Sequence, residues 1–535
     1  MMEVNEIKKN ILICLLFSIF ALLFTGCEKD MGENKVFRYD IKNGTSSIDP
    51  QFSTSPTSKM IIKNTFEGLF GYDENGKIKK VLVKDYTISQ DNLVYIFNLY
   101  DNRQWSNEDY VTANDFEYAF KRMFDSEALS PFANNYISIK NAQEILNNQL
   151  SNDFLGITAI DKSTLKVELE QPNPYFLSLL TLNAAMPCNE NFLIAAKGKY
   201  GLDVKSVLAN GPFYVKNWDN KSTITLRRNQ YYNSSDAVIA TGINYYVGRE
   251  NTFDLFAREK SDCIFIDKSE IDTVRKMKGS VIPFESTTWL LSFNQQSTAF
   301  DNENIRLAFA SSIEFENNRE FEDEHYKIAK NIIPSSANVM SGSYREKAGD
   351  LTYTYLSSLN AKEKLSLGLE ETGLKKMSKT TLLLPDNEMG KVVAQELQKV
   401  WAKNISVFIN FKLVPIDELT KLIKNKDYQI ALIPITPDND SPINSLIQFT
   451  TDNSENYFGA DNEEFNKIVY DATHSGNEET SVALIKTAEQ MLIDKAFVIP
   501  IFSSNKYFAM AEGVSDIEVS IFDENCFFKY AKRID

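Results

Sequence analysis

The order of hydrophobic and polar positions between residues 380 and 435 predicts three strands separated by two helices. Apolar residues recur at helical spacing in the two helical segments, and they fill or alternate along the three strands. The expected elements are strand 380–384, helix 389–401, strand 407–413, helix 416–424 and strand 430–435. Strands separated by helices in this way form a parallel sheet with right-handed crossovers, and ligands bind near the carboxyl ends of such strands.

Shorter patterns predict further elements in the first half of the chain. Strands are expected at 36–39, 93–99, 165–169 and 224–228. A helix is expected from Met60 to Phe70, where Gly71 stops it. Thr112 and Asp115 are spaced as the capping box at the start of another helix.

A long apolar run lies near the N-terminus, at residues 11–24. Two lysines precede it and Thr25-Gly26-Cys27 follow it, which is the anatomy of a secretory signal. The run is shorter than the about 20 residues that a membrane-spanning helix needs. Its end resembles the lipobox of bacterial lipoproteins, so we expect residues 1–26 to be a signal peptide and Cys27 to carry lipid. An uncleaved anchor and a plain secreted protein are the alternatives.

The composition of the 535-residue chain predicts a large folded protein. Hydrophobic residues make up 43% and aromatic residues 12%, enough for the cores of about three or four domain-sized units. The net charge of -16 disfavours binding to nucleic acid, because the phosphates would be repelled. The acidic stretch 314–327 is typical of a solvated helix face.

Residues with catalytic or metal-binding chemistry are sparse. His325 and His474 are the only histidines, and the sequence contains no HExxH, CxxC or GxSxG motif. This argues against a hydrolase and against a histidine-rich metal site, and we expect no cofactor. After the cysteines of the signal segment are set aside, Cys188, Cys263 and Cys526 remain. A Cys263–Cys526 disulfide is compatible with an oxidising exterior, but sequence cannot establish it.

Short motifs follow one another in a fixed order along nearly all of the mature chain. They are Asp49-Pro50, Thr65–Phe70, Tyr95–Leu99, Trp105-Ser106-Asn107, Val111–Phe116, Ser130–Ala133, Leu155-Gly156-Ile157, Asn210–Phe213 with Trp218, Ser292-Phe293-Asn294, and Ala488–Leu492 with Ile499-Pro500. By these motifs and their order, the chain resembles the oligopeptide-binding family, the large extracellular solute-binding proteins of bacterial peptide transporters. Two departures from the family pattern are Glu108, where glycine is usual, and Ile435, which replaces a tryptophan.

The resemblance implies an α/β fold, a two-lobed clamshell like the type II periplasmic binding proteins, in the large peptide-binding form with an extra inserted domain. Lobe one would consist of residues 27–66, 208–288 and 505–535, the inserted domain of 67–207, and lobe two of 289–504.

The resemblance also implies a function without catalysis. A lipid-anchored monomer at the outer face of the cytoplasmic membrane, on the cell surface or in the periplasm, would capture oligopeptides between its lobes. It would pair with the peptide main chain and deliver the peptide to an ABC permease in the membrane. Nucleic acid is not an expected partner.

Asp438 is the first candidate for a ligand-binding residue. It lies four residues before Pro442, and the resemblance implies that an aspartate at this spacing forms a salt bridge with the α-amino group of the peptide. The residues alone allow a different interpretation, in which Asp438, Asp440 or Ser441 caps a helix that begins near Ile443.

The resemblance places five further residues in the site. Thr436 lies beside the aspartate and would offer backbone atoms, and Ile435 would give the first pocket a different shape. Phe132 stands where the family has a ligand-contacting tyrosine, so its contact would be apolar; core packing is the alternative. Thr54 and Ser55 lie where family members hydrogen-bond the peptide main chain, or else in a plain polar loop.

Other functions stay open at this point. The same fold would serve a peptide sensor that feeds a signalling system, or a receptor for a non-peptide solute such as a metal complex or a sugar. An extracellular hydrolase would require paired carboxylates such as Asp438 and Asp440 to act as acid and base.

Overall fold

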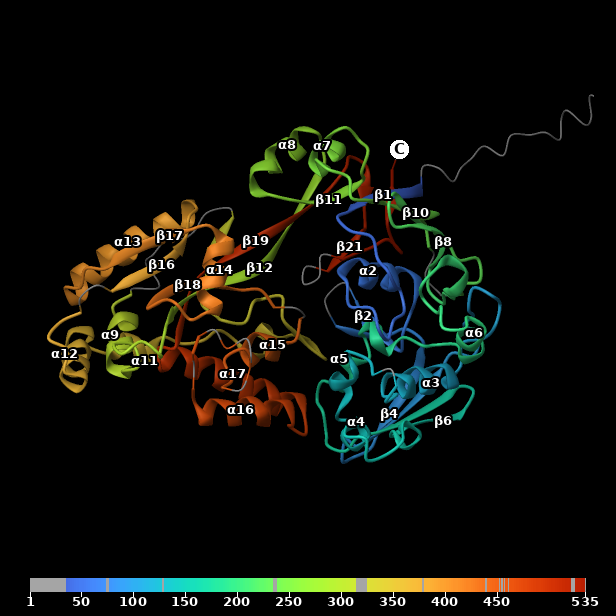
Figure 1. Ribbon diagram of the computed structural model, residues 1–535, viewed down its shortest axis with the longest axis horizontal. Helices are drawn as coiled ribbons and strands as arrows, with labels where there is room; N and C mark the ends of the chain where they lie inside the picture. The colour runs from blue at the N-terminus through green and yellow to red at the C-terminus, as the bar shows by residue number, and fades with distance from the viewer. Residues whose placement is uncertain are drawn as a thin grey trace, which may run out of the picture.

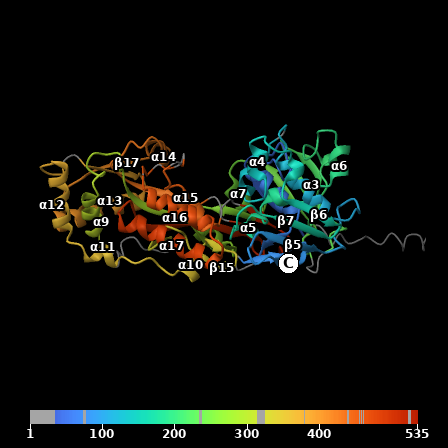
Figure 2. The same cartoon turned by 90° about the horizontal axis from the view of Figure 1, so that it is seen from below.

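The computed structural model divides the chain into two lobes that a narrow pair of strands joins (Figures 1 and 2). It describes residues 35–534 except 74–76, 128, 234–237, 314–324, 378–379, 438–439, 452, 454–455, 457, 460 and 521–524. Within this described part, no helix is both long enough and apolar enough to cross a membrane. The predicted signal peptide, Cys27 and most of the acidic stretch 314–327 lie outside the described residues.

Lobe one is built on a four-stranded sheet in the order β1-β10-β9-β8. Its strands are β1 (Val36–Ile41), β8 (Phe213–Asp219), β9 (Thr223–Arg228) and β10 (Gly242–Val247). β1 pairs in parallel with β10, whereas the other two pairings are antiparallel. The C-terminal end of the chain returns to this lobe in four short strands: β20 (Val514–Ser515), β21 (Glu518–Ser520), β22 (Asn525–Phe527) and β23 (Lys532–Arg533). The strands predicted at 36–39 and 224–228 are confirmed.

The segment 67–207 carries an antiparallel sheet in the order β4-β5-β7-β6. Its strands are β4 (Val83–Ile88), β5 (Val94–Leu99), β6 (Ile157–Asp161) and β7 (Thr164–Glu168), with the hairpin of β2 (Phe70–Tyr72) and β3 (Ile78–Lys80) beside them. The helices of this segment are α3 (Ala113–Met123), α4 (Ala142–Leu146), α5 (Phe176–Leu179) and α6 (Glu190–Ala195). Phe37 of lobe one and Phe97 of this segment belong to the same buried core, so the segment packs continuously against lobe one.

Lobe two is built on most of a mixed sheet in the order β11-β19-β12-β18-β16-β17, with β13 paired to β19, and the β11 end of this sheet packs against the core of lobe one. The strands are β11 (Cys263–Ile266), β12 (Ser280–Phe293), β13 (Tyr326–Ile328), β16 (Thr381–Pro385), β17 (Asn410–Val414), β18 (Ile430–Ile435) and β19 (Val498–Met510). The larger helices are α9 (Glu303–Ser311), α12 (Ala361–Thr372), α13 (Glu388–Ile405), α14 (Ile416–Lys424), α16 (Glu463–Thr473) and α17 (Glu478–Asp494). β16 pairs in parallel with both β17 and β18, which confirms the predicted parallel unit.

The two lobes share the long antiparallel strands β12 and β19. Residues 280–285 of β12 pair with the end of β19 near β11, and residues 288–293 pair with β18 inside lobe two. The β12–β19 ladder shifts register between Glu285 and Thr287 and again between Trp289 and Leu290. Bulges of this kind bend a strand, and here they lie where the chain passes from one lobe to the other.

The lobes also touch away from these strands. The hydroxyl groups of Tyr175 and Ser481 are 2.6 Å apart, and Asn92 Nδ2 donates to the carbonyl oxygen of Gly476 at 2.8 Å. Tyr175 and Asn92 belong to the segment 67–207, whereas Ser481 and Gly476 lie at or just before α17. The segment therefore contacts lobe two directly.

The helix predicted from Met60 to Phe70 is wrong in both of its bounds. α2 spans Pro56–Thr65, because Ser55 accepts a hydrogen bond from the amide of Ser58 and Pro56 occupies the first helical turn. The chain then leaves the helix at Phe66, where Asn210 brackets Glu67 with hydrogen bonds to its N–H at 3.1 Å and to its C=O at 2.8 Å.

The neighbouring motif residue Gly211 is required by close packing. Its amide donates to the carbonyl oxygen of Thr65 at 2.9 Å, and a Cβ atom on Gly211 would lie 2.7 Å from the carbonyl carbon of Thr65. The Asn210-Gly211 motif therefore holds the end of α2 against lobe one.

The predicted capping box is confirmed. The amide of Thr112 donates to Asp115 Oδ2 at 2.7 Å, and α3 begins at Ala113. Burial raises the pKa of Asp115 to about 6, although hydrogen bonds from Thr112 and Trp105 lower it in part.

Glu108, one of the departures from the family pattern, has a backbone φ of 77°. This left-handed region disfavours residues with a Cβ atom and favours glycine. Here the side chain of Glu108 accepts a hydrogen bond from Tyr231 at 2.6 Å, and Gln104 Nε2 donates to its carbonyl oxygen at 2.9 Å. Side-chain contacts thus offset the strain of the turn.

We predict that Glu108→Gly is more stable than Glu108→Ala by about 1 kcal/mol. Both variants lose the Tyr231 bond, but only glycine relieves the positive φ. Denaturant unfolding measures the difference, with Tyr231→Phe as the control that removes the hydrogen bond alone. Equal stability of the two Glu108 variants would contradict the strain.

Candidate functional site

The carboxyl ends of β16, β17 and β18 lie at one edge of the sheet in lobe two, beside the strands that connect the lobes (Figure 1). Thr436 follows β18 at this edge, and its side chain is exposed. Thr287 lies opposite it on β12, with the two Oγ1 atoms 2.9 Å apart. Thr436 therefore occupies the sheet edge where α/β proteins bind ligands.

Hydroxyl side chains continue from Thr436 across the sheet. Thr287 is paired with Ser504 of β19, and Ser504 is paired with Tyr326 of β13. We call Thr436, Thr287, Ser504 and Tyr326 the hydroxyl row. Trp289, two positions along β12, is half-buried, and its Nε1 donates to Ser504 Oγ at 3.2 Å. Because a hydroxyl group donates and accepts, the row suits a ligand with amide groups.

The predicted salt-bridge residue, Asp438, lies outside the described residues. The helix that follows it, α15 (Pro442–Ile447), has Ser441 at its N-cap position. The Ser441 side chain forms no capping hydrogen bond there, and the role of Asp438 stays a prediction.

Asp440 lies in the same loop and contacts the segment 67–207, which packs against lobe one. Its Oδ1 accepts a long hydrogen bond, 3.5 Å, from the hydroxyl of Tyr72 at the end of β2, and its carbonyl oxygen accepts from the amide of Asn338 at 2.7 Å. Burial raises the pKa of Asp440, while the Asn338 side chain and the positive charge of Lys63 lower it in part. The loop after β18 thus contacts the β2–β3 hairpin across the lobes.

Thr54 and Ser55 lie in a loop that buried contacts hold in place. Arg122 of α3 forms an ion pair with Asp49 at 2.7 Å and donates to Gln51 Oε1, also at 2.7 Å. Thr54 is exposed, whereas the Ser55 hydroxyl caps α2. Thr54 is thus the more available of the two predicted residues.

Phe132 is half-buried and packs against the core that lobe one shares with the segment 67–207. Its amide donates to Ser130 Oγ at 3.1 Å, and Ser130 Oγ donates to the carbonyl oxygen of Gln51 at 2.5 Å. The structure therefore ties Phe132 to the loop that carries Thr54 and Ser55, while Thr436 lies in the other lobe. The contacts of Phe132 in this structure are those of core packing, the alternative to contact with a ligand.

Sequence reasoning missed Trp289, Ser504 and Tyr72. Thr287 and Trp289 alternate with buried neighbours, a signal of a strand with one accessible face. No such signal links Trp289 to Ser504 or Tyr72 to Asp440, because long-range pairing creates these contacts. Ile435 is buried in the core, 2% exposed, and its expected effect on the shape of the first pocket stays a prediction.

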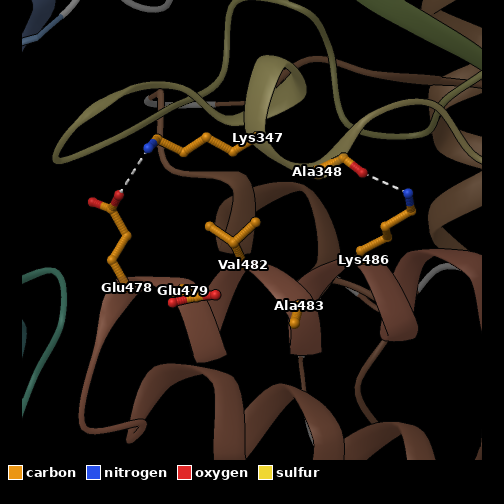
Figure 3. Close-up of a pocket in the computed structure, with 7 residues that line it drawn as sticks. All are labelled: Lys347, Ala348, Glu478, Glu479, Val482, Ala483 and Lys486. Carbon is orange, nitrogen blue, oxygen red and sulfur yellow. Dashed lines mark hydrogen bonds and ion pairs between the residues drawn. The ribbon is translucent and has the colours of Figure 1, made fainter.

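A separate cavity of about 440 Å³ lies between α10 (Tyr344–Ala348) and α17. Figure 3 shows Lys347 directed at Glu478, at 3.5 Å, and Lys486 donating to the carbonyl oxygen of Ala348 at 2.5 Å. The cavity lining includes none of the predicted site residues. In the described part of the chain, no cluster of three or more His, Cys, Asp and Glu side chains is arranged to hold a metal ion.

Comparison with known proteins connects this arrangement to a family. The family model described as "Bacterial extracellular solute-binding proteins, family 5 Middle" matches residues 77–457. The dipeptide-binding protein DppE of Bacillus subtilis is 28% identical over 500 residues, which covers 91% of this chain and 90% of that protein. The oligopeptide-binding protein OppA of the same organism is 29% identical over 559 residues, covering 98% and 100%.

Solved structures show the same fold. OppA of Listeria monocytogenes bound to peptide aligns with a TM-score of 0.63 at 24% identity, covering 94% of this chain and all of that one. The unliganded open form of the murein tripeptide binding protein MppA aligns with a TM-score of 0.74 at 21% identity, covering 94% and 98%. The predicted α/β clamshell of the type II periplasmic binding proteins is confirmed.

Asp440 generates a prediction about pH. Because its folded pKa is raised, the native state favours the protonated form, and Asp440 stabilises the fold less as the pH rises above the ordinary aspartate value. We therefore expect the stability of Asp440→Asn relative to the natural chain to increase between pH 4 and pH 7. Denaturant unfolding at several pH values measures this difference, and a difference that falls or stays constant would contradict it.

Proposed function

Because the chain belongs to the bacterial extracellular solute-binding proteins of family 5, we propose that it captures oligopeptides outside the cytoplasmic membrane and delivers them to the permease of an ABC transporter. The observation that carries the proposal is the near-complete alignment with relatives named for dipeptide and oligopeptide binding. The alignment includes both lobes, so it covers the whole binding unit and not one shared domain.

The hydroxyl row gives this ligand class a physical basis. An extended peptide presents an N–H and a C=O group at every residue, and hydroxyl groups satisfy either kind. Pairing with main-chain groups binds a peptide without regard to its side chains. Trp289 beside the row adds an apolar surface for a side chain. These features suit peptides of mixed sequence better than one defined compound.

Contacts from both lobes make closure depend on the ligand. The hydroxyl row belongs to lobe two. Thr54 lies in lobe one, and Phe132 lies in the segment 67–207 that packs against lobe one. A peptide that touches both sides binds the closed arrangement more tightly than the open one, and so shifts the population toward closure. We propose that the strands bend at the bulges in β12 and β19 when the lobes close.

We place Asp438 at the amino end of the peptide. A carboxylate that pairs with an ammonium group fixes the polarity of an extended ligand, which main-chain hydrogen bonds alone do not. The neighbouring Asp440 is engaged with Tyr72 and Asn338, which leaves it poorly suited to act with Asp438 as a catalytic pair. We infer that the protein binds peptides without cleaving them.

Lipid on Cys27 would serve delivery. The residues between Cys27 and the start of β1 would then serve as a short tether, and a tether keeps the receptor near a membrane-bound permease at high effective concentration. We propose a monomer held in this way at the outer face of the membrane.

Asp438→Asn is expected to weaken the binding of peptides by about 1.5–3 kcal/mol, because a charge-assisted hydrogen bond is lost. The probe is a set of short alanine peptides with a free amino end, measured by calorimetry. The same peptides with an acetylated amino end should bind the variant and the natural chain alike.

Asp386→Asn is the matched control, because Asp386 follows the neighbouring strand β16 at the same sheet edge and pairs with Lys391 at 3.2 Å. It should bind every peptide as the natural chain does. Equal loss with free and acetylated peptides would remove Asp438 from the amino-terminal contact. Mass spectrometry of the recovered peptides separates the alternatives, since cleavage products would indicate a hydrolase and exclusive binding of one defined peptide a sensor.

Cys27→Ala should abolish metabolic labelling with a palmitate analogue, because the acyl chains would be attached to this cysteine. Peptide binding by the purified variant should be unchanged. Label retained by the variant would contradict the anchor and leave the binding function intact.

A further inference from the structure

Two cysteines from distant parts of the chain meet in lobe one. Cys263 begins β11 and Cys526 lies in β22, and both side chains are buried in the same core, 1% and 0% exposed. The two thiols are free, and they lie close enough to interact, since Cys526 contributes to raising the pKa of Cys263. Both also contribute to raising the pKa of the buried Tyr245 hydroxyl.

Contacts outside the thiol pair hold the two strands in this position. Asn64 of α2 donates to the carbonyl oxygen of Cys526 at 2.8 Å and accepts from the amide of Phe528 at 3.1 Å. Asp262, directly before Cys263, forms an ion pair with Arg533 of β23 at 2.5 Å. The C-terminal strands and β11 are thus kept together whether or not the sulfur atoms are bonded.

The third described cysteine has a different environment. Cys188 is buried next to Arg122, whose Nη1 lies 3.7 Å from its sulfur, and it belongs to a separate small cluster with Tyr200. Cys263 and Cys526 are therefore the thiols that can pair with each other, and the pairing is unambiguous among these three.

We propose that Cys263 and Cys526 form a disulfide bond when the chain folds outside the cytoplasm. Solute-binding proteins of this family are extracellular, and exterior compartments oxidise thiols that lie close together. The proposal rests on this location and on the thiol contact, not on peptide binding, so its failure and that of the proposed function are distinguishable.

The oxidant is a small or protein-borne disulfide. One cysteine thiolate attacks a sulfur of the external disulfide, which releases one external thiol and leaves a mixed disulfide on the protein. The second cysteine thiolate then attacks the protein-bound sulfur and releases the second external thiol. Two protein S–H groups are oxidised, one S–S bond forms, and the external disulfide is reduced to two thiols that carry the two protons.

Burial sets the time at which this exchange happens. Removal from water raises the pKa of Cys263 well above its ordinary value, so the native protein holds little of the reactive thiolate. The bond therefore forms while the core is still closing. Afterwards the same burial shields it from reductants.

The bond would join the two parts of lobe one from which the chain leaves for lobe two and to which it returns. All of lobe two lies between Cys263 and Cys526 in sequence, so it would become a covalently closed loop. A cut anywhere in lobe two would then leave both fragments attached to each other.

The test is oxidative refolding of the full-length mature protein with a mixture of oxidised and reduced glutathione, followed by blocking of free thiols and peptide mapping. We expect a cross-linked peptide that contains Cys263 and Cys526, lighter than the two separate peptides by two hydrogen atoms, and a blocked Cys188. Folded protein in which both Cys263 and Cys526 remain blockable, or a cross-link to Cys188, would overturn the proposal.

A second measurement uses a site-specific protease sequence inserted after Asn425, in the exposed turn between α14 and β18. After cutting, the natural chain and Cys188→Ser should run as one band on a denaturing gel without reductant and as two bands with it. Cys526→Ser should give two bands under both conditions. Two bands from the unreduced natural chain would contradict the bond, and the Cys188→Ser control excludes an effect of thiol loss alone.

Discussion

Two antiparallel strands carry the chain between the lobes, and the rest of the molecule is arranged around this crossing. β12 leaves lobe one and β19 returns to it, hydrogen-bonded to each other along most of their length. A ladder of this kind resists stretching but bends where a bulge breaks its regular pairing. Both register shifts lie at the crossing, next to Thr287 and Trp289. The candidate ligand surface is therefore built directly on the part of the chain that bends.

The motifs that carry the family resemblance hold the scaffold together. Asp49 forms a buried ion pair with Arg122, and Asn210 brackets Glu67. Glu489, fully buried, accepts hydrogen bonds from Arg345 and from two backbone amides of the segment that leads toward the lobe interface. Removing one partner from such pairs leaves an uncompensated buried charge. These motif residues therefore stabilise the fold, whereas Thr54 and Thr436, the exposed candidates for ligand contact, lie in loops.

Local sequence patterns predicted elements well wherever the pattern was long and its ends were marked. The second helix and the third strand of the parallel unit have the predicted bounds, since apolar periodicity and the turn residues agree there. The helix at Met60 failed because its start depends on the Ser55 cap and its end on Asn210, which is far away in sequence. The placement of Thr436 was predictable from the strand before it. The hydroxyl row was not, because its members come from three separate strands and the loop after a fourth.

The sequence by itself determined the elements, the parallel unit and the family, because periodicity, caps and turns act between residues a few positions apart. Only the tertiary structure decided that Asp440 meets Tyr72, that Ser504 lies beside Trp289 and that the thiols of Cys263 and Cys526 touch. Each of these contacts joins segments that the order of residues leaves unrelated. They form because the shared core and the β12–β19 ladder fix the strands in register. Many weak contacts along the whole chain together stabilise that register.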